Sequence, residues 1–429
     1  MKKSISILFI TVVGFITHSC MDTYTEVFTA NKPVYMSYET LRSAVKQSAA
    51  RDLVQPGKIY FKDDYLFVVE ERKGIHILDL ANQSNPTNIG FIEIPGCVDM
   101  AIKQQTLYAD SYTDLVAIDV SNIQNIKEVS RIKDVLPYMV PPAANNYRMA
   151  EVDSKQGVVV DWELGTVRQA LEYNHYPIYP AWKSMESDRM LSSYSASTGV
   201  SASTSFGVGG SMARFGIHSD YLYAVDNSRC YMFDIRTSEN PVSAGSQYVG
   251  WEVETMFLYD NHMFLGTMSG MIILSLQVPL APKHVTNFWH VTSCDPVVVA
   301  DGFAYVTLRG GQPCRSNTNR LDVIQLSADY KNNTLVGSFN MTSPFGLGID
   351  GSALFVCDGD AGLKVFDATD KSRVGFNQLA HFPGIRAYDV IPVNGYLFMI
   401  GADGFYLYDY SNLKNIYLRS TIPVVKKSQ

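Results

Sequence analysis

The chain has 429 residues, of which 46% are hydrophobic, 12% aromatic and 18% charged. This composition excludes a disordered or coiled-coil protein and favours packed strands. The net charge of −7 leaves no basic surface to replace the counterions of a phosphate backbone, so we expect no nucleic-acid partner.

The N-terminus has the pattern of a secretory signal peptide. Lys2 and Lys3 precede an apolar run over residues 5–16. The run is shorter than the roughly 20 residues that a membrane-spanning helix needs. We therefore expect residues 1–19 to be a signal peptide and the mature chain to be exported.

Cys20 lies where such a peptide would be cleaved, and Thr17-His18-Ser19-Cys20 resembles a bacterial lipobox. The resemblance implies lipidation of Cys20, membrane attachment through the lipid, and location at the outer membrane or cell surface. Thr17 and His18 depart from the motif, which leaves ordinary secretion as an alternative. Residues 20–56 then form a lipidated tether, with a short helix predicted over residues 37–53 because Ser37 is a plausible N-cap.

A repeat of about 42 residues organises the rest of the chain. Seven alternating runs end at residues 79, 119, 234, 275, 325, 367 and 409, so four of the six spacings are 40 to 42 residues. In the last unit, strands are predicted over residues 387–393, 396–400, 404–410 and 415–422, separated by turn signals such as Asn394-Gly395.

Four short strands per repeat predict an all-β fold, a seven-bladed β-propeller over residues 57–425. The expected blades are 57–95, 96–135, 212–250, 251–292, 293–342, 343–383 and 384–425. An insertion, residues 136–211, separates blades 2 and 3. Its run Gly157–Leu164 is compatible with an eighth blade, but an extra hairpin is the preferred interpretation because no matching inner strand precedes it.

The repeated runs resemble those of the LVIVD-repeat proteins of Bacteroidetes. The resemblance rests on Ile75-His-Ile-Leu-Asp79, Leu115-Val-Ala-Ile-Asp119, the run Pro56–Tyr60 and the run Gly157–Trp162. Ser275 and Gln325 replace the strand-ending Asp in two repeats. Membership would imply a propeller lipoprotein of the cell envelope and no particular reaction.

The inner strands are predicted to bring charged residues to the ring axis. The expected positions are Lys58, Asp99, Arg214, Glu254, Asp295, Pro344 and Asp389. The acids among them, Asp99, Glu254, Asp295 and Asp389, could act in a hydrolase or lyase on a glycan or lactone. The preferred interpretation is structural: each Asp accepts backbone N–H groups from the adjacent blade.

The aspartates that end the third strands are predicted to be structural as well. Each is followed by turn residues, where an Asp side chain accepts the backbone N–H two residues ahead. They are Asp79, Asp119, Asp234, Asp367 and Asp409.

Six residues are candidates for binding a ligand or partner, and two of them are the ring residues Lys58 and Arg214. Arg309 and Arg315 lie in a long loop and could contact an anion, and Tyr176 and Trp182 lie in an aromatic stretch of the insertion. A second interpretation of that stretch is simple packing against a blade.

Metal ions and disulfides have little support in the sequence. Asp358 and Asp360 are only weak calcium candidates, because two acids fall short of a full ligand set. We expect no cofactor. Cys294 and Cys314 are the one pair to test as a disulfide, and we expect the other cysteines after Cys20 to be buried as small apolar side chains.

These features favour a noncatalytic binding or scaffolding protein of the cell envelope, with a protein or glycan partner. The alternative is a propeller hydrolase or lyase that uses the axial carboxylates.

Overall fold

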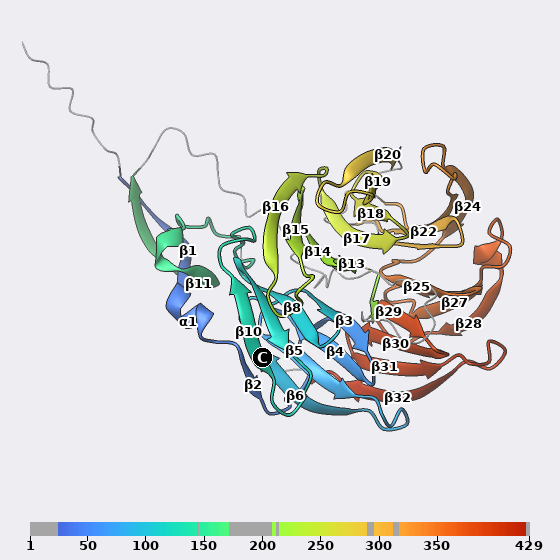
Figure 1. The fold of residues 1–429 in the computed structure, drawn as a ribbon, viewed down its shortest axis with the longest axis horizontal. Coiled ribbons are helices and arrows are strands. Elements are labelled where there is room, and N and C mark those ends of the chain that lie inside the picture. Colours follow the sequence, from blue (N-terminus) through green and yellow to red (C-terminus); the bar gives the residue numbers. More distant parts are fainter. Residues whose placement is uncertain are drawn as a thin grey trace, which may run out of the picture.

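Seven blades of four antiparallel strands form a ring in the computed structural model, which describes residues 25–143, 146–170, 208–211, 214–289, 296–311 and 317–425 (Figure 1). Blade 1 contains β3 (Pro56–Lys62), β4 (Tyr65–Glu70), β5 (Gly74–Asp79) and β6 (Thr87–Glu93). Blade 2 contains β7 (Met100–Lys103), β8 (Thr106–Ser111), β9 (Asp114–Asp119) and β10 (Lys127–Ile132). Blade 3 contains β13 (Phe215–His218), β14 (Tyr221–Val225), β15 (Arg229–Asp234) and β16 (Val242–Tyr248).

The second half of the ring repeats the same order of strands. Blade 4 contains β17 (Val253–Tyr259), β18 (His262–Thr267), β19 (Gly270–Ser275) and β20 (Lys283–Trp289). Blade 5 contains β21 (Val297–Ala300), β22 (Phe303–Leu308), β23 (Arg320–Gln325) and β24 (Thr334–Asn340). Blade 6 contains β25 (Leu347–Asp350), β26 (Ala353–Cys357), β27 (Leu363–Asp367) and β28 (Gln378–Phe382), with a 3₁₀ turn at Val374–Phe376. Blade 7 contains β29 (Ala387–Val393), β30 (Tyr396–Gly401), β31 (Gly404–Asp409) and β32 (Tyr417–Pro423).

The first strand of each blade is the innermost, and neighbouring inner strands contact one another around the ring. The contacts run from β3 to β7, β13, β17, β21, β25 and β29, and β29 returns to β3. The predicted seven-bladed propeller is therefore confirmed. Blades 1 and 7 meet side by side without exchanging strands, and Arg419 and Ser420 of β32 donate hydrogen bonds to Ser84 and Gln83 of blade 1.

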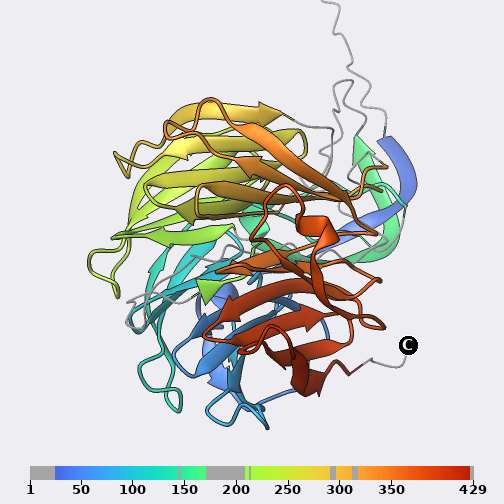
Figure 2. The ribbon, with the colours of Figure 1, turned by 90° about the vertical axis from the view of Figure 1, so that its right-hand side faces the viewer.

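The eighth-blade alternative is wrong. The run that suggested it belongs to β11 (Val158–Ala170), which pairs antiparallel with β1 (Thr25–Met36), from Thr25 opposite Ala170 to Met36 opposite Val158. This two-stranded ribbon lies outside the ring, at the left of Figure 1 and on the upper right of Figure 2. The expected extra hairpin is thus replaced by a strand whose partner comes from the N-terminal segment.

The predicted helix after the ribbon is much shorter than expected. Helix α1 spans Tyr38–Arg42, with the Ser37 Oγ accepting the Thr40 N–H as predicted for an N-cap. Residues Lys46–Ser48 instead form β2, a fifth strand on blade 1 that pairs with β6. Pairing with the open edge of β6 satisfies the backbone groups of this segment, so the helix ends early.

An ion-pair network fastens α1 to blade 2. The buried carboxylate of Asp114 accepts hydrogen bonds from Arg42 Nε at 2.9 Å and from Arg131 Nη1 at 3.1 Å. Arg42 also contacts Asp134 Oδ2 at 2.8 Å. A further 3₁₀ turn, Ser154–Gln156, precedes β11.

The strand-ending aspartates have the structural role predicted for them. The carboxylates of Asp79, Asp119, Asp234, Asp367 and Asp409 each accept the N–H two residues ahead, at 2.8–3.0 Å. Cys97, Cys230 and Cys357 are free and buried, as expected of small apolar side chains. Cys294 and Cys314 lie outside the described residues. No helix within the described ranges is long and apolar enough to cross a membrane.

Candidate functional site

A segment of the insertion occupies the centre of the ring. Strand β12 (Val208–Gly209) pairs with β3, with Val208 opposite Phe61 and Gly209 opposite Tyr60. Val208 packs against the core formed by blades 6, 7 and 1 and also against the core formed by blades 4, 5 and 6. This side chain therefore joins two of the hydrophobic cores of the ring. We call residues 208–211 the axial segment.

Asp389 holds the end of the axial segment. Its Oδ1 accepts the Ser211 N–H at 3.1 Å and the Ser211 hydroxyl at 3.2 Å, while the Ser211 Oγ accepts the Leu347 N–H at 2.7 Å. A Cβ atom on Gly210 or Gly346 would overlap the Asp389 carboxylate. Glycine is thus required at both positions for this close approach.

Burial favours the neutral form of the Asp389 carboxyl. Loss of solvation raises the pKa of Asp389 to about 8, although hydrogen bonds from Val390 and Ser211 and the charge of Lys58 act in the opposite direction. Its Oδ2 is buried without a hydrogen-bond partner among the described residues.

Asp99 and Lys58 form a buried ion pair on the neighbouring inner strands. Lys58 Nζ lies 3.0 Å from Asp99 Oδ2, and both residues are 2% exposed. Asp99 Oδ2 also accepts the N–H groups of Arg214 and Phe215, both at 3.1 Å, from the adjacent blade 3. Burial raises the pKa of Asp99 to about 7 and lowers the pKa of Lys58. Asp99 thus makes the blade-to-blade bonds that the structural interpretation expects.

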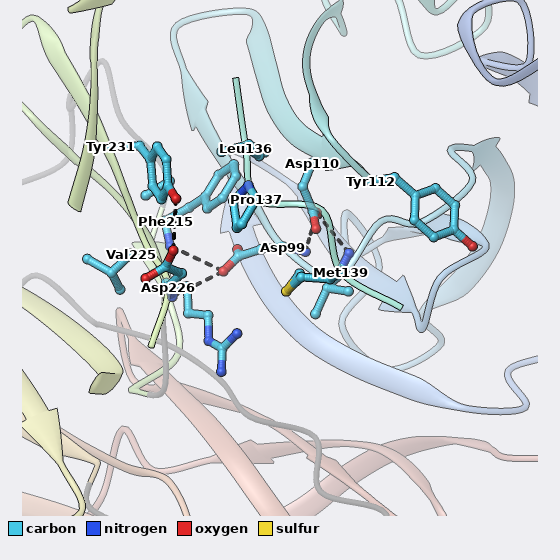
Figure 3. Close-up of a pocket in the computed structure, with 13 residues that line it drawn as sticks. Asp99, Asp110, Tyr112, Leu136, Pro137, Met139, Phe215, Val225, Asp226 and Tyr231 are labelled. Carbon is cyan, nitrogen blue, oxygen red and sulfur yellow. Dashed lines mark hydrogen bonds between the residues drawn. The ribbon is translucent and has the colours of Figure 1, made fainter. Parts of the chain in front are cut away.

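A small cavity between blades 2 and 3 adjoins Asp99 (Figure 3). Its volume is about 40 Å³, and its walls include Asp110, Tyr231 and Phe215 together with Pro137 and Met139 of the insertion. This volume holds a few water molecules and is far below the roughly 300 Å³ of a small-molecule site.

The polar groups of the cavity are committed to backbone and side-chain bonds. Asp110 Oδ1 accepts the Val98 and Asp99 N–H groups at 2.8 Å, and burial raises the pKa of Asp110 to about 6. The Tyr231 hydroxyl donates to Asp226 Oδ2 at 2.8 Å (Figure 3).

Sequence reasoning missed a repeated role for the acids near the end of the second strands. Glu70 accepts the N–H groups of Val54 and Gln55, just as Asp110 accepts those of residues 98 and 99. Asp358 likewise accepts the N–H groups of Thr342 and Ser343. Each acid therefore fixes the segment that precedes the first strand of its own blade. The recurrence of an acid near the end of the second strand was the sequence signal that could have predicted this role.

The weak calcium candidates do not form a metal site. The Asp358 carboxylate is buried and also paired with Lys364, while Asp360 is exposed and contacts Arg386 at 3.2 Å. Over the ranges that the structure describes, no cluster of three or more His, Cys, Asp or Glu side chains could hold a metal ion.

The remaining candidates are scattered or outside the described residues. Arg309 is buried, with its guanidinium 4.2 Å from the Phe345 ring centroid. Glu254 is near enough for its charge to raise the pKa of Arg214, which burial lowers. The candidates Cys20, Asp295, Arg315, Tyr176 and Trp182 lie outside the described residues.

Comparison with known proteins supports the repeat and the fold. Residues 57–94, which cover blade 1, match the LVIVD repeat. No curated protein matches the chain. A putative 6-phosphogluconolactonase from Bacteroides fragilis has a similar structure, with a TM-score of 0.51 and 8% identity over 90% of this chain and 97% of that one.

Two further solved structures have lower similarity. The computationally designed Ika8 protein gives a TM-score of 0.48 at 8% identity, over 92% of its chain and 88% of this one. PorZ, a surface component of the type-IX secretion system of Porphyromonas gingivalis, gives 0.47 at 9% identity, over 88% of this chain and 39% of its own. At these identities the likeness extends to the propeller fold alone.

Proposed function

We propose that this protein is a noncatalytic binding module of the cell envelope, attached by a lipid on Cys20, with a protein or glycan as partner. The observation that carries the proposal is the filled ring axis. The axial segment occupies the centre, and Asp99 and Asp389 are buried in hydrogen bonds to backbone groups. A hydrolase or lyase would need these carboxyls to converge on an open, water-filled funnel.

The position of Thr25 is compatible with the proposed anchor. Thr25 pairs with Ala170 at the end of the ribbon that lies away from the ring (Figure 1). A lipid on Cys20, five residues earlier, would leave the ring at a distance from the membrane. Replacing Cys20 by Ala should move the protein from the membrane fraction to the soluble fraction. Retention in the membrane fraction would contradict the anchor.

The enzyme alternative rests on one specific observation. Asp99 and Asp110 border the same cavity, and both have raised pKa values, about 7 and about 6. Perturbed carboxyls in a cavity are a common feature of active sites. Structural burial explains both shifts here, because loss of solvation is the largest influence on each pKa and the two backbone N–H groups that each carboxyl accepts act in the opposite direction.

A turnover assay separates the two functions. The purified protein should leave chromogenic glycosides and lactones unchanged, while it binds a polysaccharide or protein fraction extracted from the envelope of the producing cell. The Asp110→Asn variant should bind that fraction as the wild type does. Turnover that Asp110→Asn abolishes would establish the enzyme instead.

A further inference from the structure

The ribbon of β1 and β11 carries an open strand edge outside the ring (Figures 1 and 2). Strand β11 has 13 residues, whereas strands usually have about five or six. Its residues Leu164, Thr166 and Arg168 are exposed, Leu164 by 53%. Two paired strands are only marginally stable by themselves in water, so a further strand on this edge would stabilise the ribbon.

The register shows which backbone groups of β11 point outward. The N–H and C=O groups of Asn31 bond to residues 148 and 150, so they point away from β11. Asn31 is directly opposite Leu164, and directly opposite residues in an antiparallel pair either both bond to each other or both point outward. Leu164 therefore points its backbone groups away from β1. This direction repeats at every second residue, so the outward residues of β11 are Trp162, Leu164, Thr166 and Arg168.

Most of these outward groups have no partner among the described residues. The Trp162 N–H is bonded to the Asp161 carboxylate at 2.8 Å. Residues 138–141 of the insertion bond to the Gly157 carbonyl and to the Trp162 indole. Further along the strand, over residues 164–168, the outward N–H groups bond to no described residue. This stretch can therefore accept another strand.

The outer edge of β1 is protected, whereas that of β11 is not. On β1, residues 148–150 cover Asn31, and Pro33, two residues on, has no N–H group to offer. Natural edge strands are commonly blocked by proline or lysine. Strand β11 contains neither, and six of its 13 residues are Val, Thr or Trp. It has the composition of a strand that pairs on both sides.

The outward residues make this edge complementary to itself. They are centred on Gly165, so a second copy that runs antiparallel about this residue pairs Leu164 with Thr166 and Trp162 with Arg168. Both members of each pair point their backbone groups outward, so all four residues can bond. A two-fold contact of this kind uses the same patch on both chains and closes at two copies.

The charges of β11 favour the antiparallel arrangement as well. The exposed stretch is acidic near its start, at Asp161 and Glu163, and basic near its end, at Arg168. Antiparallel pairing brings Arg168 of each copy to the acidic end of the other, beside Trp162 of the second copy, where an indole face attracts a guanidinium group. Parallel pairing in register would instead place the two Arg168 side chains next to each other.

We propose that two copies of this protein dimerise by antiparallel pairing of their β11 strands about Gly165. The two ribbons then form one four-stranded sheet. The contact lies outside the ring and does not depend on the proposed binding function.

Sedimentation equilibrium of the Cys20→Ala protein tests the proposal without detergent. Its mass should rise from one chain to two over a concentration series up to roughly 100 μM, which reveals micromolar dissociation constants. Thr166→Pro removes an outward N–H group from both copies and should weaken the dimer by roughly tenfold or more. The matched control is Thr29→Pro, because Thr29 is directly opposite Thr166 and points its N–H group away from β11.

Disulfide trapping tests the register with a substitution that keeps the backbone N–H groups. At the two-fold axis the two Gly165 residues form a pair without hydrogen bonds, with Cα atoms about 4.5 Å apart, which a disulfide can span. A Cβ atom on Gly165 would meet the flexible Lys32 side chain, which can shift. Gly165→Cys should therefore give a covalent dimer on mild oxidation. Thr166→Cys should not, because its two Cα atoms lie about 7–8 Å apart.

Several results would overturn the inference. They are a monomer at every concentration, equal weakening by Thr29→Pro and Thr166→Pro, and equal trapping of Gly165→Cys and Thr166→Cys. An extended segment of another protein as the natural occupant would leave the purified chain monomeric. The protein without an added cysteine is the control for oxidation, because Cys97, Cys230 and Cys357 are buried.

Discussion

The ammonium group of Lys58 and the carboxylate of Asp99 form a buried ion pair, 3.0 Å apart, that joins the inner strands of blades 1 and 2. The same carboxylate oxygen accepts two N–H groups from blade 3. One oxygen atom therefore ties three consecutive blades together. Since a propeller is stable only as a closed ring, this contact connects blades whose own sheets are too small to be stable alone.

Removing the cation should destabilise the ring markedly. Lys58→Met leaves a buried carboxylate without its partner, which typically costs about 3 kcal/mol or more. We expect a lower midpoint of guanidinium unfolding at pH 7. Lys32→Met is the control, because the side chains of its ion pair with Glu163 are 45% and 61% exposed. Such surface pairs contribute less than about 1 kcal/mol. Equal shifts in the two variants would contradict the assigned role of Lys58.

The blades were predictable because a local sequence pattern specifies each one. Alternating apolar residues, a turn signal and, in five repeats, a strand-ending Asp recur, as at Asp79 and Asp409, and the four repeated strands of each blade pair with strands adjacent in the chain. The ring positions of Lys58 and Asp99 followed from counting back along the inner strands.

The long-range contacts could not be predicted in this way. Thr25 pairs with Ala170, and Ser211 bonds to Asp389, across separations that no local pattern encodes. The helix predicted over residues 37–53 failed for the same reason, because the edge of β6 is a partner that lies outside the segment. Surface aromatics such as Trp251 carry no periodic signal at all.

Two tyrosines at equivalent positions should differ in how much their buried hydroxyl groups contribute to stability. Tyr108 and Tyr305 are the third residues of β8 and β22. The Tyr108 hydroxyl donates to the Ser238 carbonyl of the next blade at 2.6 Å, whereas the Tyr305 hydroxyl is buried without a hydrogen-bond partner among the described residues. Tyr108→Phe should cost about 1 kcal/mol, while Tyr305→Phe should be neutral or stabilising. Thermal unfolding of the two variants provides the comparison, and a larger loss in Tyr305→Phe would refute it.

Glu70 should make the protein sensitive to acid. Burial alone would raise its pKa, but hydrogen bonds from His76 and from the Val54 and Gln55 N–H groups outweigh burial and lower the pKa of Glu70 to about 2. The ionised form stabilises the fold above the unfolded-state pKa of 4.5, and this contribution disappears as the pH falls toward 2.

The Glu70→Gln variant tests this dependence. It should lose roughly 3 kcal/mol at pH 7 and unfold in acid with a shallower pH dependence than the wild type. Glu163→Gln, at a side chain that is 61% exposed, should follow the wild type at every pH. Parallel acid-unfolding curves for wild type and Glu70→Gln would show that His76 and the two N–H groups do not stabilise the carboxylate.

The contribution of Asp389 to folding stability should depend on pH in the opposite direction. The pKa of its buried carboxyl is about 8, against 3.8 for the unfolded chain. A raised pKa means that the folded state holds a proton that the unfolded state releases. The stabilisation is therefore complete below about pH 4 and is lost progressively as the pH rises through 8, by roughly 6 kcal/mol in total for this one group.

Asp389→Asn should remove most of that dependence while it keeps an oxygen that accepts the Ser211 N–H and hydroxyl. We expect the variant to gain stability relative to the wild type between pH 5 and pH 9, measured by guanidinium unfolding at fixed ionic strength. The gain arises because the amide need not ionise in a site that Gly210 and Gly346 close tightly. An identical slope for the two proteins over this range would mean that Asp389 is already ionised in the folded ring, held by Lys58 rather than neutralised by burial.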